Sequence, residues 1–273
     1  MTRTLIVFGS GPGIGNNVAA AFASKGIDHI ILLARNTQRL ENEDAPFVSK
    51  GHNSVKVDTL RLDLANLDSI PSVITKIDHL TENEDVEVVF FNAARIKPSE
   101  PLGVSVQEID EDFKVWSHYY YTTTTLLHSA VPLPNPTQPN HPKTQIANPL
   151  SLTQTTNLAL YIIAQHYLPR LQTLASSSSS PSPLKPALLV TNSALPWDPI
   201  PQLLSLSAVK AAQANMVQSF DRAFAGSGVH IGLIHVCGQV APGNKVLNPG
   251  TIAERTVAFW EVGRGVEVRI EEE

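Results

Sequence analysis

A short apolar run that ends in a cluster of glycines constrains this chain more than any other stretch. Residues 5–15 read LIVFGSGPGIG, with glycines at positions 9, 11, 13 and 15, and the residues that follow have helical spacing. Such a run is typical of a buried strand, and the glycines allow a tight turn into a helix. The N–H groups at a helix N-terminus, helped by the helix dipole, bind phosphate. The segment therefore predicts a dinucleotide site, although glycines also serve turns that bind nothing.

The bulk composition narrows the class of protein. The chain has 273 residues and is 42% hydrophobic, which is enough for one large α/β domain with a full core. A net charge of −5 gives no basic surface for nucleic acid, and no apolar run approaches the ~20 residues that span a membrane. The first strand starts at once, which leaves no room for a signal peptide. We therefore expect a cytoplasmic protein.

The one cysteine supports the same expectation. Cys237 has no partner within the chain for a disulfide, which fits a reducing compartment. We expect it to be a small apolar residue on a buried strand rather than a reactive thiol.

The first third of the chain alternates between predicted strands and helices. Helical spacing predicts helices over residues 14–25, which Gly26 would close, and over residues 67–80. Strands are predicted over residues 4–8, 29–36, 55–63 and 86–91. This alternation is typical of a doubly wound parallel sheet, the Rossmann fold, whose ligands bind outside the carboxyl ends of the strands.

Two of these strands end in side chains that a dinucleotide would use. The second strand runs into Arg35; a carboxylate there would bind the ribose of NAD, whereas a guanidinium favours the 2′-phosphate of NADP. Asp63, after the third strand, would bind the adenine amino group with Leu64 beside the ring. Alternatively, Asp63 caps a helix that starts near Asn66, and Arg35 is an ordinary exposed arginine. The sequence favours NADP, with NAD as the weaker alternative.

Residues 115–154 interrupt the alternation. This 40-residue segment is rich in Thr, Pro, Asn and His, contains no acidic residue and has no sustained period. Its histidines lack the spacing of metal ligands, so no metal site is predicted. Two interpretations stay open: an irregular insertion in a loop that enters a helix, and a retained intron that has been translated. Sequencing the mature transcript separates them.

The alternation resumes after this segment. Helices are predicted over residues 155–174, 203–225 and 251–262, and strands over residues 187–191, 229–236 and 265–270. Residues 176–186, SSSSSPSPLKP, have the composition of a surface linker. We expect residues 1–273 to form a single domain that contains the segment 115–154.

The order of these motifs resembles the short-chain dehydrogenase/reductases. The glycine turn, an Asn-Ala-Ala segment after the fourth strand, a serine at the end of the fifth, a lysine on the next helix and a glycine after the sixth all match. The resemblance covers nearly the whole chain apart from 115–154. It implies an NAD(P)-dependent oxidoreductase that acts on a carbonyl or alcohol. The cofactor-binding residues it implies, with those proposed above, are Gly9, Ser10, Gly13, Ile14, Gly15, Arg35, Asp63, Leu64, Asn92, Ala93, Lys210, Gly238 and Val240.

The catalytic residues that the resemblance implies are incomplete. Ser193 would bind the substrate oxygen, Lys210 would hold the nicotinamide ribose, and Asn157 would support a water-linked proton path. The family's tyrosine would stand four residues before Lys210, where this chain has Leu206. Leucine has no proton to give, and a general acid contributes ~10²–10⁴ in rate. Lys210 is then a candidate for a weak proton donor, or else an ordinary solvent-facing lysine.

Further residues near these motifs leave alternatives open. Tyr161 and Tyr167 fall on another predicted helix and would reach the site only if the packing brings them there. The stretch 195–197, Leu-Pro-Trp, indicates either an apolar wall of the substrate pocket or a loop that packs one tryptophan on the surface. After the sixth strand, Gly238 and Val240 match the family, whereas Pro242 replaces a threonine that would bind the nicotinamide amide.

Three functions follow from this reading. The first is an NADP-dependent reductase or dehydrogenase with a small-molecule substrate. The second is a non-catalytic NAD(P)-binding protein, a sensor or partner subunit on the same scaffold. The third is a degenerate product that binds nothing. A homo-oligomer is compatible with the first two, because family members pair through their helices. The substrate is not readable.

Overall fold

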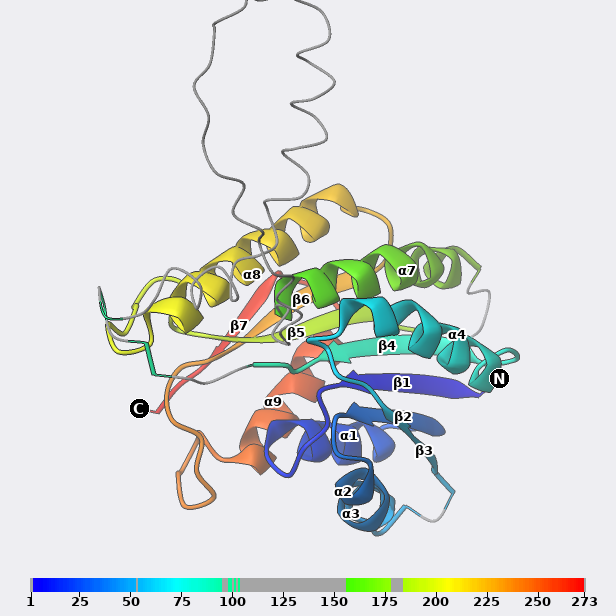
Figure 1. The fold of residues 1–273 in the computed structure, drawn as a ribbon. Coiled ribbons are helices and arrows are strands. Elements are labelled where there is room, and N and C mark those ends of the chain that lie inside the picture. Colours follow the sequence, from blue (N-terminus) through cyan, green and yellow to red (C-terminus); the bar gives the residue numbers. More distant parts are fainter. Residues whose placement is uncertain are drawn as a thin grey trace, which may run out of the picture.

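The computed structural model describes residues 2–52, 54–94, 156–177 and 184–272, together with residues 98, 99, 101 and 103. The segment 115–154 lies outside them. They form a seven-stranded sheet in the order β3-β2-β1-β4-β5-β6-β7, in which every pair of neighbours is parallel (Figure 1). The strands are β1 (Arg3–Phe8), β2 (His29–Ala34), β3 (Lys56–Arg61), β4 (Asp85–Phe91), β5 (Ala187–Ser193), β6 (His230–Val236) and β7 (Glu267–Ile270). The predicted doubly wound sheet is confirmed.

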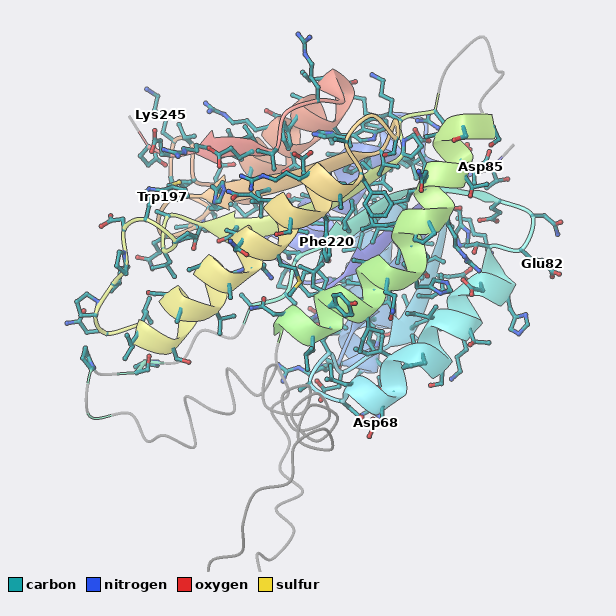
Figure 2. The ribbon with its side chains drawn as sticks, turned by 90° about the horizontal axis from the view of Figure 1, so that it is seen from above. Asp68, Glu82, Asp85, Trp197, Phe220 and Lys245 are labelled. Carbon is teal, nitrogen blue, oxygen red and sulfur yellow. The ribbon has the colours of Figure 1, made fainter. Side chains whose placement is uncertain are left out.

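Helices cover both faces of this sheet (Figure 1). One face carries α1 (Ile14–Ala23), the short α2 (Thr37–Arg39), η1 (Leu40–Asp44) and α3 (Ala45–Ser49), and α9 (Pro249–Val262). On the other face lie η2 (Leu67–Ser69), α4 (Ile70–Leu80), α7 (Thr156–Ser177) and α8 (Leu204–Ala223). Figure 2 shows α4, α7 and α8 side by side over the sheet. Because both faces are covered, the strands read as nearly continuous apolar runs.

The side chains of β1 illustrate how the two faces are filled. Leu5 and Val7 belong to the hydrophobic cluster with α1 and α9, and Ile6 and Phe8 to the cluster with α4, α7 and α8. This alternation is the two-residue period of a strand. The ring of Phe8 lies 6.2 Å from that of Tyr167 on α7, centroid to centroid. The central strand is thereby fixed from both sides.

Most predicted elements are shifted by one to three residues at an end, and three differences from the prediction deserve description. α1 ends at Ala23, and its C-cap is Ser24 rather than Gly26. The residues between β2 and β3 fold as α2, η1 and α3, each too short to show a hydrophobic period. β5 continues through Ser193 because Asn192 and Ser193 still pair with β6. The last two differences bear directly on the site described below.

The amino ends of the strands are held by buried carboxylates. Glu87 of β4 is fully buried and accepts hydrogen bonds from Arg3 Nε at 2.6 Å and from the Lys185 N–H at 2.7 Å. His29 of β2, also fully buried, lies 2.6 Å from Glu84. These contacts connect β1, β2, β4 and the start of β5 at one edge of the sheet.

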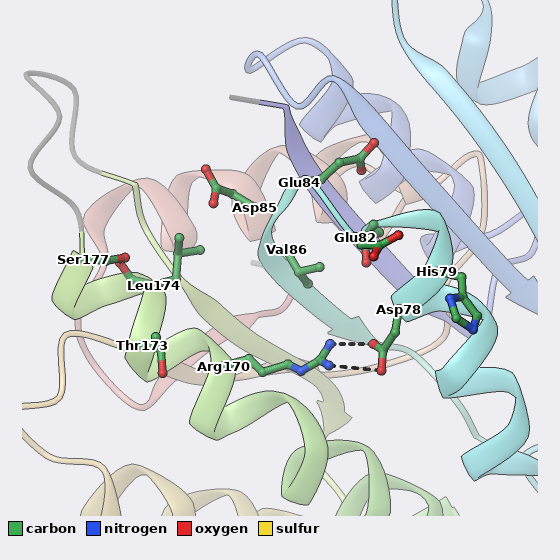
Figure 3. A pocket seen from close by; sticks show the side chains of 11 residues that line it. Asp78, His79, Glu82, Glu84, Asp85, Val86, Arg170, Thr173, Leu174 and Ser177 are labelled. Atoms are coloured by element: carbon green, nitrogen blue, oxygen red, sulfur yellow. Dashed lines mark hydrogen bonds and ion pairs between the residues drawn. The ribbon is translucent and has the colours of Figure 1, made fainter.

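A hollow of about 530 Å³ also lies at this amino edge. It is lined by the end of α4, the start of β4 and the second half of α7, with Glu82 and Asp85 at its rim (Figure 3). Arg170 crosses it to form an ion pair with Asp78. Doubly wound sheets bind their ligands at the carboxyl ends of the strands, so this hollow is not the expected site.

We predict that Glu87→Ala destabilises the fold. The substitution leaves the Arg3 guanidinium and the Lys185 N–H without their acceptor, at a cost of about 3 kcal/mol in the free energy of unfolding. Urea denaturation followed by circular dichroism measures it. The exposed Glu82 at the same edge provides the control, because Glu82→Ala should change stability by less than about 0.5 kcal/mol. Equal losses for the two variants would contradict the prediction.

Candidate functional site

The glycine turn between β1 and α1 stands where the order of the strands reverses. β1 has β2 on one side and β4 on the other, and ligands of such sheets bind at this reversal. Gly9 has a φ of 99°, and a Cβ on it would lie 2.5 Å from the carbonyl oxygen of Asn92. A Cβ on Gly15 would lie 2.8 Å from the carbonyl oxygen of Gly9. Close backbone packing therefore requires both glycines.

Gly13 serves a different purpose. It is the N-cap residue of α1, and a Cβ on it would meet no atom within 4 Å. The absent side chain therefore leaves open space in front of the first N–H groups of the helix. These groups bind anions such as the pyrophosphate of a dinucleotide. The residues present fit such a group: two glycines build the turn and the third leaves room for a ligand.

The segment after β4 lies directly against this turn. Asn92 donates from its backbone N–H to the Phe8 carbonyl (2.8 Å) and from Nδ2 to the Gly9 carbonyl (3.1 Å). Ala93 follows and is half-buried. The structure thus places Asn92 and Ala93 beside the glycines, the arrangement that the resemblance implied.

A buried network that the sequence did not reveal holds the turn in place. Asp44 of η1 accepts hydrogen bonds from Asn16 Nδ2 (2.7 Å) and Arg39 Nε (3.1 Å). Asn16 Oδ1 accepts from Ser10 Oγ (2.7 Å) and from the Gly11 N–H (3.0 Å). The hydroxyl of Ser10, a predicted cofactor ligand, therefore points inward and supports the turn. Only the fold of residues 40–44 brings Asp44 here, so no sequence motif could have identified it.

Arginine side chains gather around the end of β2. Arg35 follows the strand and is exposed. Arg61 of β3 donates to the Arg35 carbonyl at 3.4 Å. Arg39 is not among the predicted cofactor-binding residues. It donates from an Nη atom to the Ser10 carbonyl at 2.8 Å and so lies against the glycine turn. The carboxyl end of β2 is thus a region rich in arginine, and Arg39 connects it to the glycine turn.

The end of β3 carries the predicted adenine contacts. Asp63 Oδ1 accepts a hydrogen bond from the Ala65 N–H at 3.1 Å, which closes a turn in the loop. The N-cap of the following helix is Asn66, so the alternative that Asp63 caps a helix is wrong. Leu64 is half-buried against the cluster beneath α4. Ile14, the first residue of α1, packs on the opposite face.

Lys210 is buried rather than solvent-facing. Only 5% of it is exposed, and its Nζ donates to the Thr191 carbonyl of β5 and to Gln213 Oε1, both at 2.9 Å. Burial lowers the pKa of Lys210 to about 7. The alternative of an ordinary surface lysine is therefore wrong.

Two asparagines hold the part of α8 that carries Lys210. Asn157 of α7 donates from Nδ2 to the Val209 carbonyl, and Asn192 of β5 donates from Nδ2 to the Lys210 carbonyl, both at 3.1 Å. Asn157 is 4% exposed. The structure thus brings Asn157, which lies 65 residues beyond Asn92 in the chain, to the residue preceding Lys210.

Ser193 lies at the end of β5 beside a histidine on β6. Its Oγ accepts from the Leu195 N–H (3.3 Å), and its carbonyl accepts from His235 Nδ1 (2.9 Å). Burial lowers the pKa of His235. The ring of Trp197 stands edge-on to His235 at 4.7 Å, and the Arg269 guanidinium lies 4.3 Å from the Trp197 centroid. Trp197 is therefore a tryptophan packed at the surface on this side of the site (Figure 2).

The described tyrosines do not take the place of the missing one. Leu206 is half-buried, four residues before Lys210 on α8. Tyr167 is fully buried against Phe8, and burial raises the pKa of its hydroxyl. Tyr161 is half-exposed, with its ring 6.5 Å from that of Phe220. Neither ring has a contact that connects it to Ser193.

The loop after β6 completes this edge. Gly238 has a φ of 147°, and a Cβ there would lie 2.7 Å from Leu247 Cδ1. Val240 packs against the cluster of α1 and α9. Cys237 follows β6 rather than lying on it, is half-buried, and has its pKa raised by burial. The expectation that Cys237 lies on a buried strand is therefore wrong.

Two kinds of feature are absent from the described residues. They contain no group of three or more His, Cys, Asp or Glu side chains placed to hold a metal ion. None of the helices within these ranges has the length and apolar composition needed to cross a membrane.

Comparisons with known proteins agree with this architecture. Residues 3–130 match the family model described as short chain dehydrogenase. An alcohol dehydrogenase from Thermococcus sibiricus, complexed with 5-hydroxy-NADP, is similar with a TM-score of 0.69 at 20% identity, over 98% of this chain and 95% of that one. An NADPH-bound short chain oxidoreductase from Pseudomonas aeruginosa, containing an atypical catalytic center, has a TM-score of 0.67 at 14% identity. The match covers 98% of this chain and 95% of that one. No curated protein sequence matches.

We predict that the glycines of the turn differ in what they contribute to stability. Gly9→Ala forces a side chain into the left-handed region and against Asn92, which should cost about 1–3 kcal/mol in the free energy of unfolding. Gly13→Ala meets no atom and should cost less than about 1 kcal/mol. Urea unfolding of both variants without ligand measures the difference. A larger loss for Gly13→Ala than for Gly9→Ala would contradict this assignment.

Proposed function

We propose that the chain is a member of the short-chain dehydrogenase/reductase family and an NADP-dependent oxidoreductase that interconverts the carbonyl and alcohol forms of a small molecule. The observation that carries the proposal is the glycine turn at the reversal of strand order, with open space in front of Gly13. The contact between Gly9 and Asn92 fixes that turn.

The charge around the turn supports NADP. A pyrophosphate at Gly13 directs the adenosine toward the ends of β2 and β3. There the exposed Arg35 offers a guanidinium for a 2′-phosphate, with Arg61 and Arg39 close to the same strand end. A guanidinium binds phosphate through two parallel hydrogen bonds. Asp63 and Leu64 would hold the adenine, and Ala93, Gly238 and Val240 would line the nicotinamide end.

The reaction needs a hydride and a proton. When bound, the reduced nicotinamide supplies the hydride to the carbonyl carbon. Ser193 would orient the carbonyl oxygen, which must then be protonated. Leu206 cannot donate a proton, whereas Lys210, with a pKa near 7, exists as both ammonium and amine at neutral pH. A donor with a pKa near the working pH is the most effective general acid. We assign that role to Lys210, with Asn157 holding its helix.

His235 is the other titratable group described beside Ser193. Its Nδ1 bonds the Ser193 backbone carbonyl rather than pointing along the Ser193 hydroxyl, and its ring is covered by Trp197. We therefore propose that His235 holds the backbone of Ser193 and does not transfer a proton.

A non-catalytic NAD(P)-binding protein is the second candidate. The observation that favours it is the position of the Lys210 ammonium, which bonds Thr191 and Gln213 within the protein while Leu206 occupies the place of the acid. This function requires the same dinucleotide site and no turnover. Measuring binding and turnover separately distinguishes the two.

We predict that Arg35 discriminates between the two dinucleotides. Arg35→Ala should weaken NADPH binding about 10-fold, because a charged hydrogen bond contributes about 1.5–3 kcal/mol, and should change NADH binding less than about 2-fold. Gly13→Ala should weaken both, since its methyl group would occupy the space for the pyrophosphate. Fluorescence titration with each dinucleotide measures these affinities.

Arg222→Ala on α8 is the control and should change neither affinity. No binding of either dinucleotide to the natural protein would overturn the proposal.

We predict a pH profile set by Lys210. Reduction requires the ammonium form, so the turnover number for aldehyde or ketone reduction with NADPH should fall as pH rises through about 7. Lys210→Met should lower it by ~10²–10⁴ at pH 6. Leu206→Tyr, which places a phenol one helical turn from Lys210, should raise turnover. If only Leu206→Tyr turns over, the second candidate function is correct.

A further inference from the structure

Lys210 lies in a cluster of buried polar side chains. Gln213 and Asn157 are 0% and 4% exposed, and Thr191 is 8% exposed. They come from α8, α7 and β5: Gln213 and Thr191 contact the ammonium itself, and Asn157 bonds the carbonyl of the preceding residue, Val209. Burying a polar side chain destabilises the folded state unless the side chain is hydrogen-bonded, so we expect each of these side chains to have partners.

The hydrogen bonds of this cluster are incomplete. The ammonium has three N–H groups, of which the Thr191 carbonyl and Gln213 Oε1 each accept one at 2.9 Å. Gln213 Nε2, Thr191 Oγ1 and Asn157 Oδ1 are buried and have no hydrogen-bond partner among the described residues. A buried polar atom without a partner destabilises the fold, because it has lost its hydrogen bonds to water and gained none in return. The cluster therefore retains donors and acceptors that the folded chain itself does not use.

The groups that face Lys210 are neutral. Thr191 approaches from β5, Asn157 holds the adjoining turn of α8, and Gln213 lies three residues along the same helix. The nearby titratable His235 of β6 bonds the Ser193 carbonyl instead. Among the described residues no carboxylate contacts the ammonium, and Gln213 supplies its side-chain acceptor.

An amide has a property that neither a carboxylate nor an alkyl group shares. Its oxygen accepts from an ammonium, and its nitrogen donates to the lone pair of an amine. Rotation of the Gln213 amide by half a turn exchanges the two ends. Because Nε2 has no partner within the part of the chain that the structure describes, that rotation breaks none of the described hydrogen bonds of the nitrogen. Gln213 can therefore bond Lys210 in both of its protonation states.

We propose that Gln213 is a positioning residue that bonds Lys210 as ammonium and as amine, and so keeps Lys210 able to donate and recover the proton of the reaction. This role rests on the proposed function. In the reduction, the hydride from the reduced nicotinamide forms the new C–H bond and the π electrons of the carbonyl move to its oxygen. That oxygen takes a proton from Nζ, leaving a neutral amine and the oxidised nicotinamide. Solvent water returns the proton to the amine.

The titration of Lys210 without any dinucleotide tests this role. NMR of protein labelled with 13C at lysine Cε follows it, and Lys210→Met identifies the resonance. Gln213→Glu is nearly isosteric and puts a carboxylate beside the ammonium, so the midpoint should rise by roughly 1–3 pH units. Gln213→Leu removes the acceptor, so the midpoint should fall. Gln218→Glu, on the same helix, is the control and should leave the midpoint unchanged.

The pH dependence of catalysis should shift in the same directions. The pH at which the turnover number for reduction falls should be higher in Gln213→Glu and lower in Gln213→Leu than in the natural protein. A midpoint that Gln213→Glu does not move, in a variant that circular dichroism shows to be folded, overturns the role of Gln213 even if Gln213→Leu fails to fold. Midpoints that move in the expected order without any turnover would support the contact with Lys210 and overturn the proposed oxidoreductase function instead.

Discussion

The structure depends on the close approach of two backbones where the strand order reverses. Gly9 lies so near Asn92 that a single added carbon would stand 2.5 Å from its carbonyl oxygen. The hydrogen bonds from Asn92 to Phe8 and Gly9 then join the ends of β1 and β4. Everything else at this edge is positioned relative to that junction. α1 starts there, and the buried Asp44 network holds the turn from the side of η1. This half of the site is built mainly from backbone.

The second half of the site is built differently. Ser193, Lys210 and Asn157 come from β5, α8 and α7, and side-chain amides connect these elements. A buried lysine with only neutral partners loses part of its preference for the charged form, because no opposite charge compensates for the lost water. In a protein with a phenol nearby, such a lysine can act on that phenol. With leucine in that position, the same burial makes the lysine itself the group that titrates near neutrality. The environment of Lys210, rather than its mere presence, therefore decides what chemistry remains.

The sequence predicted the fold, because periodic patterns identify its strands and helices, and it pointed to the glycine turn that the structure places where the strand order reverses. Alternating apolar runs and helices identify a parallel sheet, and Gly9, Gly13 and Gly15 identify its ligand edge. Asp44 and Arg39 could not be predicted, because residues 37–49 form elements too short for a period, and only the fold brings them to Ser10. Gln213 was likewise hidden, since a glutamine on a helix is normally exposed. Its position three residues after Lys210 allows a contact within the helix, but its burial depends on how α8 is rotated against the sheet.

The glycine turn bears on dinucleotide binding, whereas the residues around Lys210 bear on proton transfer. A turn made of backbone and glycines survives most changes of side chain, so its geometry supports the proposed binding of a dinucleotide. Proton transfer depends on single side chains, and a change from tyrosine to leucine removes the usual donor without disturbing the scaffold. The fold tolerates Leu206 because that position is only half-buried on α8. The same scaffold can therefore hold a dinucleotide with or without catalysis. Which of the two this chain does depends on whether the Lys210 ammonium can leave Thr191 and Gln213 and reach an oxygen held at Ser193, two residues further along β5.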